Sequence, residues 1–138
     1  EGLILLTNQG DLVNRIMRAG NFHEKEYIVQ VNRPVTKDFL QKMGKGVPVL
    51  DTVTRPCPVE KISEDTFRII LTQGLNRQIR RMCEYLGYEV VRLKRVRIMN
   101  LTLKGLKKGD YREITKQELR ELERLLKDSD SRPWKERR

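Results

Sequence analysis

The hydrophobic positions at the start of the chain predict a strand followed by a helix. Residues 2–7 form a continuous apolar run that a polar turn closes, which is typical of a strand buried on both faces. After the turn, apolar residues recur at helical spacing until Gly20 interrupts them. These helical positions are Leu12, Val13, Ile16 and Met17.

The middle of the chain predicts further strands around one short helix. Apolar residues alternate over 26–32, so Tyr27 shares one strand face with Val29 and Val31. A helix is expected after Thr36, whose side chain is suited to cap a helix N-terminus. The following residues, 47–63, are rich in Val, Thr and Pro, which indicates extended or edge-strand structure. A clearer strand is predicted over 66–72.

The last third predicts two helices with β structure between them. The first helix runs from about 76 to 86, and a β-rich segment follows over 89–103. A short strand is expected near 111–114. Thr115 and Glu118 have the spacing of a capping box and begin the last helix. This succession predicts an α+β protein with a mixed, mainly antiparallel sheet and inserted helices.

The length of 138 residues predicts a single domain, with the fold over 1–127 and a polar tail over 128–138. No apolar run approaches the roughly 20 residues of a membrane-spanning helix, and we expect a cytoplasmic protein. The chain has one histidine and no CxxC motif, so neither a zinc site nor a disulfide framework is expected. Cys57 and Cys83 are therefore interpreted as reduced thiols.

The net charge of +10 favours a polyanionic partner, most often nucleic acid, with a membrane surface as the weaker alternative. Residues 77–97 carry seven basic residues and two acids, which is half of the whole excess. Four of the basic residues, Arg92, Lys94, Arg95 and Arg97, follow one another along a β segment and project from both of its faces. We therefore expect an anionic partner against one face.

The other three basic residues lie on the predicted helix over 76–86. Helical spacing gathers its apolar residues on one side and turns Arg77 and Arg81 away from them. Arg80 falls at the border, where a guanidinium can enter a cleft and hold a carboxylate through two hydrogen bonds. The alternative is that all three form a solvated helix face.

Several segments together resemble the RsuA-type bacterial rRNA pseudouridine synthases. The resemblance covers roughly residues 1–115, and the segments keep the order and spacing of that family. They are residues 2–8 (GLILLTN), 25–27 (KEY), 73–82 (QGLNRQIRRM), 88–93 (YEVVRL) and 97–98 (RI).

This resemblance implies an isomerase that detaches uracil from ribose at N1 and rejoins it through C5, without cofactor or metal. It implies that Tyr27 lies against the target base and helps to remove the C5 proton, and that Arg80 pairs with a catalytic aspartate. Leu93 matches the apolar residue of the uracil pocket. Exposure and charge predict RNA contacts from the helix residues Asn76, Arg77 and Arg81 and from the β-segment residues Arg92, Lys94, Arg95 and Arg97.

The sequence departs from the family at one important point. In the family the nucleophilic aspartate belongs to a G-R-L-D segment just before the match to residues 2–8, whereas this sequence starts at Glu1. We therefore expect the C-terminal part of a catalytic domain, without the S4-like domain, that binds large-subunit rRNA but does not turn it over alone. The alternative is a non-catalytic RNA-binding or ribosome-associated module that uses the Arg77–Arg97 surface. No oligomeric state is indicated.

Overall fold

A five-stranded antiparallel sheet with four helices forms the structure, a computed structural model that describes residues 2–7, 10–17, 22–103 and 106–127. The strand order is β4-β5-β1-β6-β7, and β2 and β3 form a separate hairpin. This arrangement confirms the predicted α+β class. The strands are β1 (Lys25–Val31), β2 (Pro48–Val49), β3 (Thr52–Val53), β4 (Val59–Ser63), β5 (Thr66–Leu71), β6 (Val90–Ile98) and β7 (Leu101–Thr102). The helices are α1 (Gly10–Met17), α2 (Lys37–Lys45), α3 (Gln78–Tyr85) and α4 (Lys116–Leu125).

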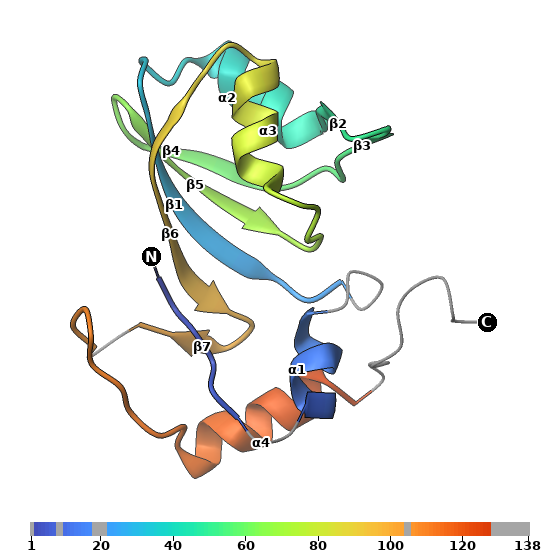
Figure 1. Ribbon diagram of the computed structural model, residues 1–138, viewed down its shortest axis with the longest axis vertical. Helices are drawn as coiled ribbons and strands as arrows, with labels where there is room; N and C mark the ends of the chain where they lie inside the picture. Colours follow the sequence, from blue (N-terminus) through green and yellow to red (C-terminus); the bar gives the residue numbers. More distant parts are fainter. Residues whose placement is uncertain (1, 8–9, 18–21, 104–105, 128–138) are drawn as a thin grey trace.

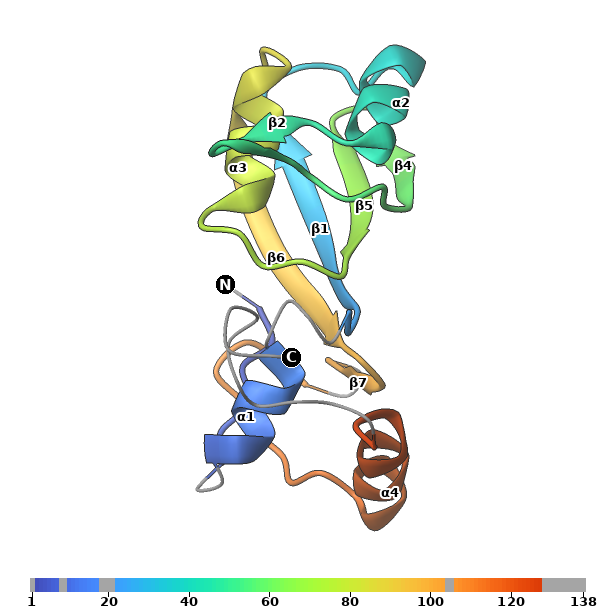
Figure 2. The ribbon, with the colours of Figure 1, turned by 90° about the vertical axis from the view of Figure 1, so that its right-hand side faces the viewer.

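The upper core lies between one face of the sheet and helices α2 and α3 (Figures 1 and 2). Val29 and Val31 of β1 are buried there, as the alternation predicts. The side chain of Thr36 accepts a hydrogen bond from the backbone N of Phe39 at 3.1 Å, which confirms the expected cap of α2. The sheet therefore presents one face to the helices.

A second core lies at the lower end of the sheet, around α1 and α4 (Figure 1). Its buried residues include Ile16 of α1 and Leu122 of α4. The predicted capping box is confirmed, because Glu118 N donates to Thr115 Oγ1 at 3.1 Å and Thr115 N donates to Glu118 Oε1 at 2.9 Å. The long strand β6 ends in this core and so joins the two halves.

Two predicted strands are wrong. Residues 2–7 form only an isolated parallel bridge from Gly2 to β6, and Ile4 and Leu6 are 72% and 91% exposed. The apolar run is therefore buried on one face only, because no described residue covers the other. The expected strand at 111–114 is also absent: these residues pair with no strand of the described sheet, and Tyr111 is 90% exposed. Gly20 and the polar tail at 128–138 lie outside the described residues.

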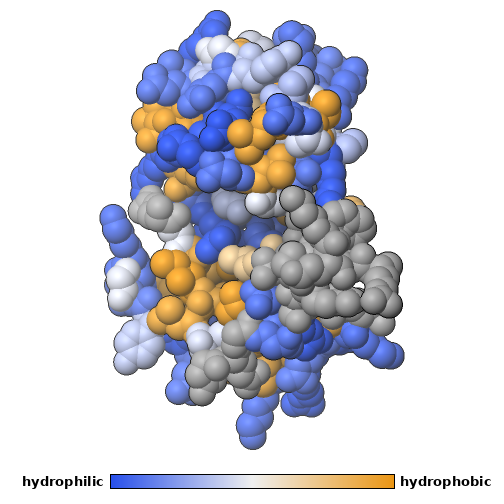
Figure 3. Space-filling model, turned by 45° about the vertical axis from the view of Figure 1, so that its right-hand side comes forward, coloured by the Kyte–Doolittle hydropathy of each residue, from blue (hydrophilic) through white to orange (hydrophobic). Residues whose placement is uncertain are grey.

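On the face drawn in Figure 3, hydrophobic surface appears in both halves of the molecule, and one cluster lies in the half that holds α1 and α4. A hollow of about 490 Å³ lies there between residues 5–7, α1 and α4. Its lining includes Leu6 of the N-terminal segment and Leu119 of α4. The apolar side chain of Leu119 therefore faces this hollow and is not fully buried.

Both cysteines belong to the upper half of the molecule and are free thiols. Cys83 belongs to α3 and is fully buried, and Cys57 is half-buried with its Sγ 3.7 Å from the carbonyl oxygen of Met43. Burial raises the pKa of the Cys57 thiol to about 11 and that of the Cys83 thiol to about 12.

Candidate active site and RNA interface

Tyr27 occupies the middle of the sheet, on the face that α2 and α3 cover. Its Cα pairs with Ile69 of β5 on one side and with Arg95 of β6 on the other. The side chain is half-buried and packs against the upper core, which includes Ile79 of α3. Strand β1 therefore holds this ring between two neighbouring strands, on the side of the sheet where the 73–82 segment lies.

Leu93 of β6 lies beside Tyr27 on the same face of the sheet. Its Cα pairs with Val29, and it stands two residues before Arg95, the strand partner of Tyr27. Leu93 is half-buried and packs against the same core. The register thus makes Tyr27 and Leu93 diagonal cross-strand neighbours. These two sequence-predicted site residues are brought together.

A buried glutamine shapes the loop that leads into α3. The Gln78 side chain is 5% exposed; its Oε1 accepts from Leu75 N at 3.2 Å, and its Nε2 donates to Gln73 Oε1 at 3.3 Å. Arg77 adopts a left-handed conformation, with φ 49° and ψ 38°, so α3 begins later than its predicted start. Sequence analysis missed the role of Gln78, although its place inside the 73–82 segment was the available signal.

Arg80 lies in the first turn of α3, next to the buried Ile79. The residue is half-buried, and its charge acts on the neighbouring thiol of Cys83. Within the described part of the chain its guanidinium makes no hydrogen bond or ion pair. The border position predicted from helical spacing is confirmed. A guanidinium in such a position is chemically able to receive a carboxylate or phosphate in bidentate geometry.

The outer side of the same helix start carries Asn76, Arg77 and Arg81. Asn76 and Arg77 are exposed. The Arg81 guanidinium donates from Nε to the backbone oxygen of Asn76 and from Nη2 to its Oδ1, both at 3.0 Å. These bonds hold the cation of Arg81 against the loop, which groups the three residues at one end of α3. The predicted helix contacts therefore form one polar, basic surface.

Arg95 has a structural task that the sequence did not reveal. Its Nε and Nη2 donate to the backbone oxygen of Leu3 at 3.0 and 2.8 Å, and Leu3 N donates to the Arg95 oxygen at 2.8 Å. Gly2 forms the parallel bridge with the same residue. Because Arg95 is also the strand partner of Tyr27, it fixes the N-terminal segment one strand away from Tyr27.

Gly2→Ala is expected to destabilise the chain by about 1–3 kcal/mol, a typical cost of strained backbone. Gly2 has φ +129°, and an added Cβ would lie 2.4 Å from Arg95 N. Urea unfolding measures the effect. Gly109→Ala is the matched control, because Gly109 has φ +86° but no atom within 4 Å of an added Cβ. Equal losses for the two variants would contradict a close approach between Gly2 and Arg95.

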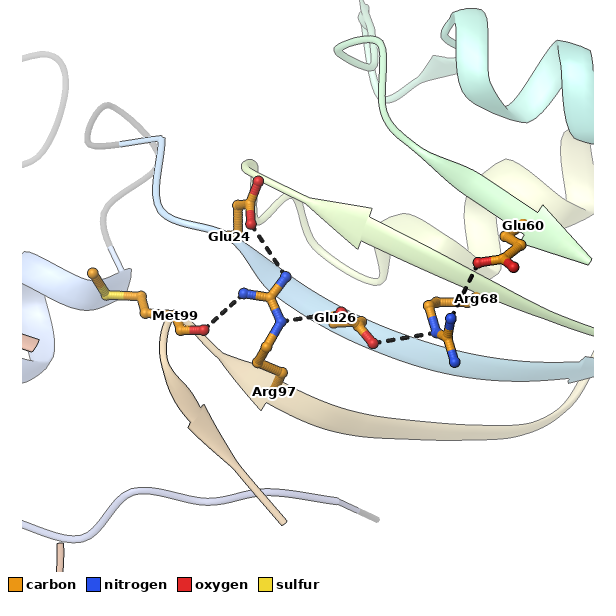
Figure 4. Close-up of polar contacts among 6 residues, drawn as sticks. All are labelled: Glu24, Glu26, Glu60, Arg68, Arg97 and Met99. Atoms are coloured by element: carbon orange, nitrogen blue, oxygen red, sulfur yellow. Dashed lines mark hydrogen bonds and ion pairs between the residues drawn. The ribbon is translucent and has the colours of Figure 1, made fainter. Parts of the chain in front are cut away.

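The opposite face of the sheet carries Arg92, Lys94 and Arg97. Their strand partners on β1 are Gln30, Ile28 and Glu26, which point away from α2 and α3. Arg97 is held in an ion-pair ladder across the sheet (Figure 4). The ladder consists of the pairs Arg97 with Glu24 (3.1 Å), Arg97 with Glu26 (3.0 Å), Arg68 with Glu26 (3.2 Å) and Arg68 with Glu60 (3.1 Å). The basic residues of β6 are therefore divided between two faces.

Lys25, the first residue of β1, is 8% exposed. Its Nζ donates to the backbone oxygen of Ile16 at 3.2 Å, near the C-terminal end of α1, where the helix dipole favours a cation. Burial, and next the charge of Arg95, lower the pKa of Lys25 to about 8. The pKa of His23 is likewise lowered, first by burial and then by the positive charges of Lys25 and Arg15. Sequence analysis did not single out this lysine.

The low pKa of Lys25 predicts a pH-dependent stability difference between the wild type and Lys25→Met. Below pH 8 both the folded and unfolded states bind the proton, whereas between pH 8 and 10.5 only the unfolded state does. The stability of the wild type relative to the variant should therefore rise in this window, by up to about 1.4 kcal/mol per pH unit. Urea melts at pH 7, 8 and 9 measure the difference, in which the thiol contributions cancel. A stability difference that stays constant with pH would contradict a lowered pKa for Lys25 in the folded state.

The described residues hold no group of three or more His, Cys, Asp or Glu side chains able to bind a metal ion. Among them there is also no helix long and apolar enough to cross a membrane. The chemistry of the site thus consists of one ring, one apolar neighbour, a half-buried guanidinium and a basic helix start.

Comparisons with known proteins point to one family. A family model described as "RNA pseudouridylate synthase" matches residues 1–85. The Salmonella typhi protein named "Dual-specificity RNA pseudouridine synthase RluF" is 58% identical over 95% of this chain and 45% of its own length. The Bacillus subtilis "Ribosomal large subunit pseudouridine synthase B" is 35% identical over 90% of this chain and 53% of its own length.

A solved structure described as "Crystal structure of pseudouridylate synthase" superimposes with a TM-score of 0.82 at 29% identity, covering 88% of this chain and 54% of that one. The antiparallel sheet thus has the fold of a known enzyme class. The chain is a member of the RNA pseudouridylate synthase family. It spans about half the length of the curated relatives it matches.

Proposed function

We propose that this chain is the C-terminal part of a cytoplasmic enzyme that isomerises uridine to pseudouridine in large-subunit rRNA. Residues 1–127 would form the C-terminal part of the catalytic domain, with 128–138 as a polar tail. The single observation that carries the proposal is the position of Tyr27, which lies beside Leu93 on the face covered by α3. Its strand partner Arg95 binds the N-terminal segment.

The roles of the site residues follow from their chemistry. Tyr27 offers a flat ring for a flipped uracil and a hydroxyl that can exchange a proton with C5. Leu93 supplies an apolar wall beside it. Arg80 offers a guanidinium that can hold a carboxylate, which the family resemblance assigns to an aspartate ahead of Gly2. No metal or cofactor takes part in the proposed reaction.

The RNA interface is proposed at the start of α3, where Asn76, Arg77 and Arg81 group together. Arg92 and Lys94 would extend it across the opposite face of β6. Arg95 and Arg97 already bind protein oxygens, so their contribution to RNA binding would come from charge more than from new hydrogen bonds. Such a basic surface predicts binding that weakens strongly as salt increases.

The proposal is tested with rRNA that carries tritium at uracil C5. The 138-residue chain is expected to bind this RNA without releasing tritium, whereas a longer chain that includes the G-R-L-D segment is expected to release it. A folded longer chain that binds the RNA but releases no tritium would reject the enzymatic function. That result would favour a non-catalytic, ribosome-associated module.

The interface is tested separately from the chemistry. Arg77→Glu with Arg81→Glu is expected to abolish measurable binding at moderate salt, because both changes reverse a charge on the proposed surface. Lys37→Glu with Lys42→Glu is the matched control, since these lysines belong to α2. Equal losses for both pairs would indicate general charge attraction and contradict a defined interface.

A further inference from the structure

A second aromatic side chain lies just before the strand that carries Tyr27. Phe22 precedes β1 by three residues, and its side chain is 54% exposed. The guanidinium carbon of Arg55 lies 3.9 Å from the centre of the Phe22 ring. Within the described residues no other aromatic-pair or cation–π contact involves Phe22, and about half of its surface is exposed to solvent.

Arg55 is fixed to the loop that leads into α3. Its Nη1 donates to the backbone oxygen of Thr72 at 2.8 Å, and its backbone N donates to Gln73 Oε1 at 3.1 Å. The same Gln73 Oε1 accepts from the buried Gln78. The ring of Phe22 is therefore backed by a cation that hydrogen bonds tie to the loop between β5 and α3, the loop that ends in Asn76 and Arg77.

The backbone at Phe22 is held in an unusual conformation. Its φ of +58° lies in the left-handed region, which a bulky side chain adopts only at a cost. An exposed phenylalanine has no hydrophobic reason to be kept in that conformation. Strain of this kind concentrates at sites that bind ligands.

We propose that the Phe22 ring, backed by Arg55, is a stacking subsite for an unpaired RNA base that neighbours the target uridine. The inference rests on the proposed function and deepens it. A guanidinium on one ring face leaves the other face able to stack, and unpaired bases in RNA are commonly bound on aromatic rings. The position next to the Asn76–Arg77 loop matches an RNA strand whose phosphates contact that loop.

The subsite is tested with an RNA octanucleotide that has one uridine among adenosines. A second octanucleotide lacks the bases on both sides of the uridine but keeps every phosphate. Phe22→Ala and Phe22→Leu are each expected to weaken binding of the intact RNA about tenfold, with no effect on the abasic one. Tyr111→Ala is the matched control, because Tyr111 is another exposed aromatic residue but lies between β7 and α4.

A spectroscopic reading complements the affinities. Phe22→Trp, in a chain whose single native Trp134 is replaced by Phe, should keep the wild-type affinity and lose indole fluorescence when the intact RNA binds. Quenching should be weak with the abasic RNA. Urea melts check that the Phe22 variants remain folded.

Each outcome decides a separate claim. If Phe22→Ala binds the intact RNA as tightly as the wild type, or loses affinity equally for both RNAs, the stacking subsite is rejected while the proposed function stands. If Phe22→Leu binds like the wild type, the contact is apolar and not a stack, and the inference is equally rejected. If the wild type binds neither RNA, the proposed function fails with it.

Discussion

In a longer chain that releases tritium from uracil C5, Tyr27→Phe is expected to lower the rate by about 10²–10⁴-fold, the usual contribution of a positioned proton-transfer group. RNA affinity should barely change, because the phenylalanine ring can still stack against the uracil. Single-turnover tritium release measures the rate, and filter binding measures the affinity.

Tyr88→Phe is the matched control for this prediction. The Tyr88 hydroxyl donates one hydrogen bond, to the backbone oxygen of Pro34 at 2.8 Å, and the Tyr88 ring lies against Phe39 in the upper core. Loss of this hydrogen bond should cost about 1 kcal/mol of stability and leave the rate of tritium release unchanged. A Tyr27→Phe enzyme that turns over like the wild type would remove the hydroxyl from the mechanism.

Phe67→Ala is expected to lower the free energy of unfolding by about 3–5 kcal/mol, which is a large part of the stability of a small domain. Phe67 is fully buried in the middle of β5. Its ring meets that of Phe39 edge to face, with centroids 5.3 Å apart. Its removal would leave a cavity between the sheet and α2. Urea unfolding followed by circular dichroism measures the loss.

Phe67→Leu should cost clearly less than Phe67→Ala, because most of the volume is kept. If both variants had the wild-type midpoint, the contact between α2 and the sheet would not be the core of the upper half. RNA binding by Phe67→Leu should stay normal, since Phe67 is fully buried and cannot itself contact RNA.

Local features of this fold could be predicted because they depend on neighbours in sequence. The alternation around Tyr27 defined a strand face, and the helical spacing around Arg80 defined a half-buried border position. The cap at Thr36 and the capping box at Thr115 each need only residues three positions apart. Spacing along the sequence was therefore enough to predict the strand face of Tyr27 and the helix border of Arg80, whereas their catalytic roles rest on the family resemblance.

Long-range features could not be predicted in the same way. The apolar run at 2–7 reads as a doubly buried strand, but burial of Ile4 and Leu6 depends on whether another segment covers them. The partners of Arg95 and Arg97 stand 92 and 71–73 residues away in sequence, at Leu3, Glu26 and Glu24. Only the strand register decides which basic residues face the site.

The state of the two thiols has a practical consequence for work on this protein. A thiolate is the form that reacts with maleimides, and burial keeps both native thiols protonated at neutral pH, with pKa values of about 11 for Cys57 and 12 for Cys83. A cysteine introduced at an exposed position such as Tyr111 would therefore take up a fluorescent dye selectively at pH 7. Single-molecule labelling could thus be carried out in the native background, with no cysteine removed first.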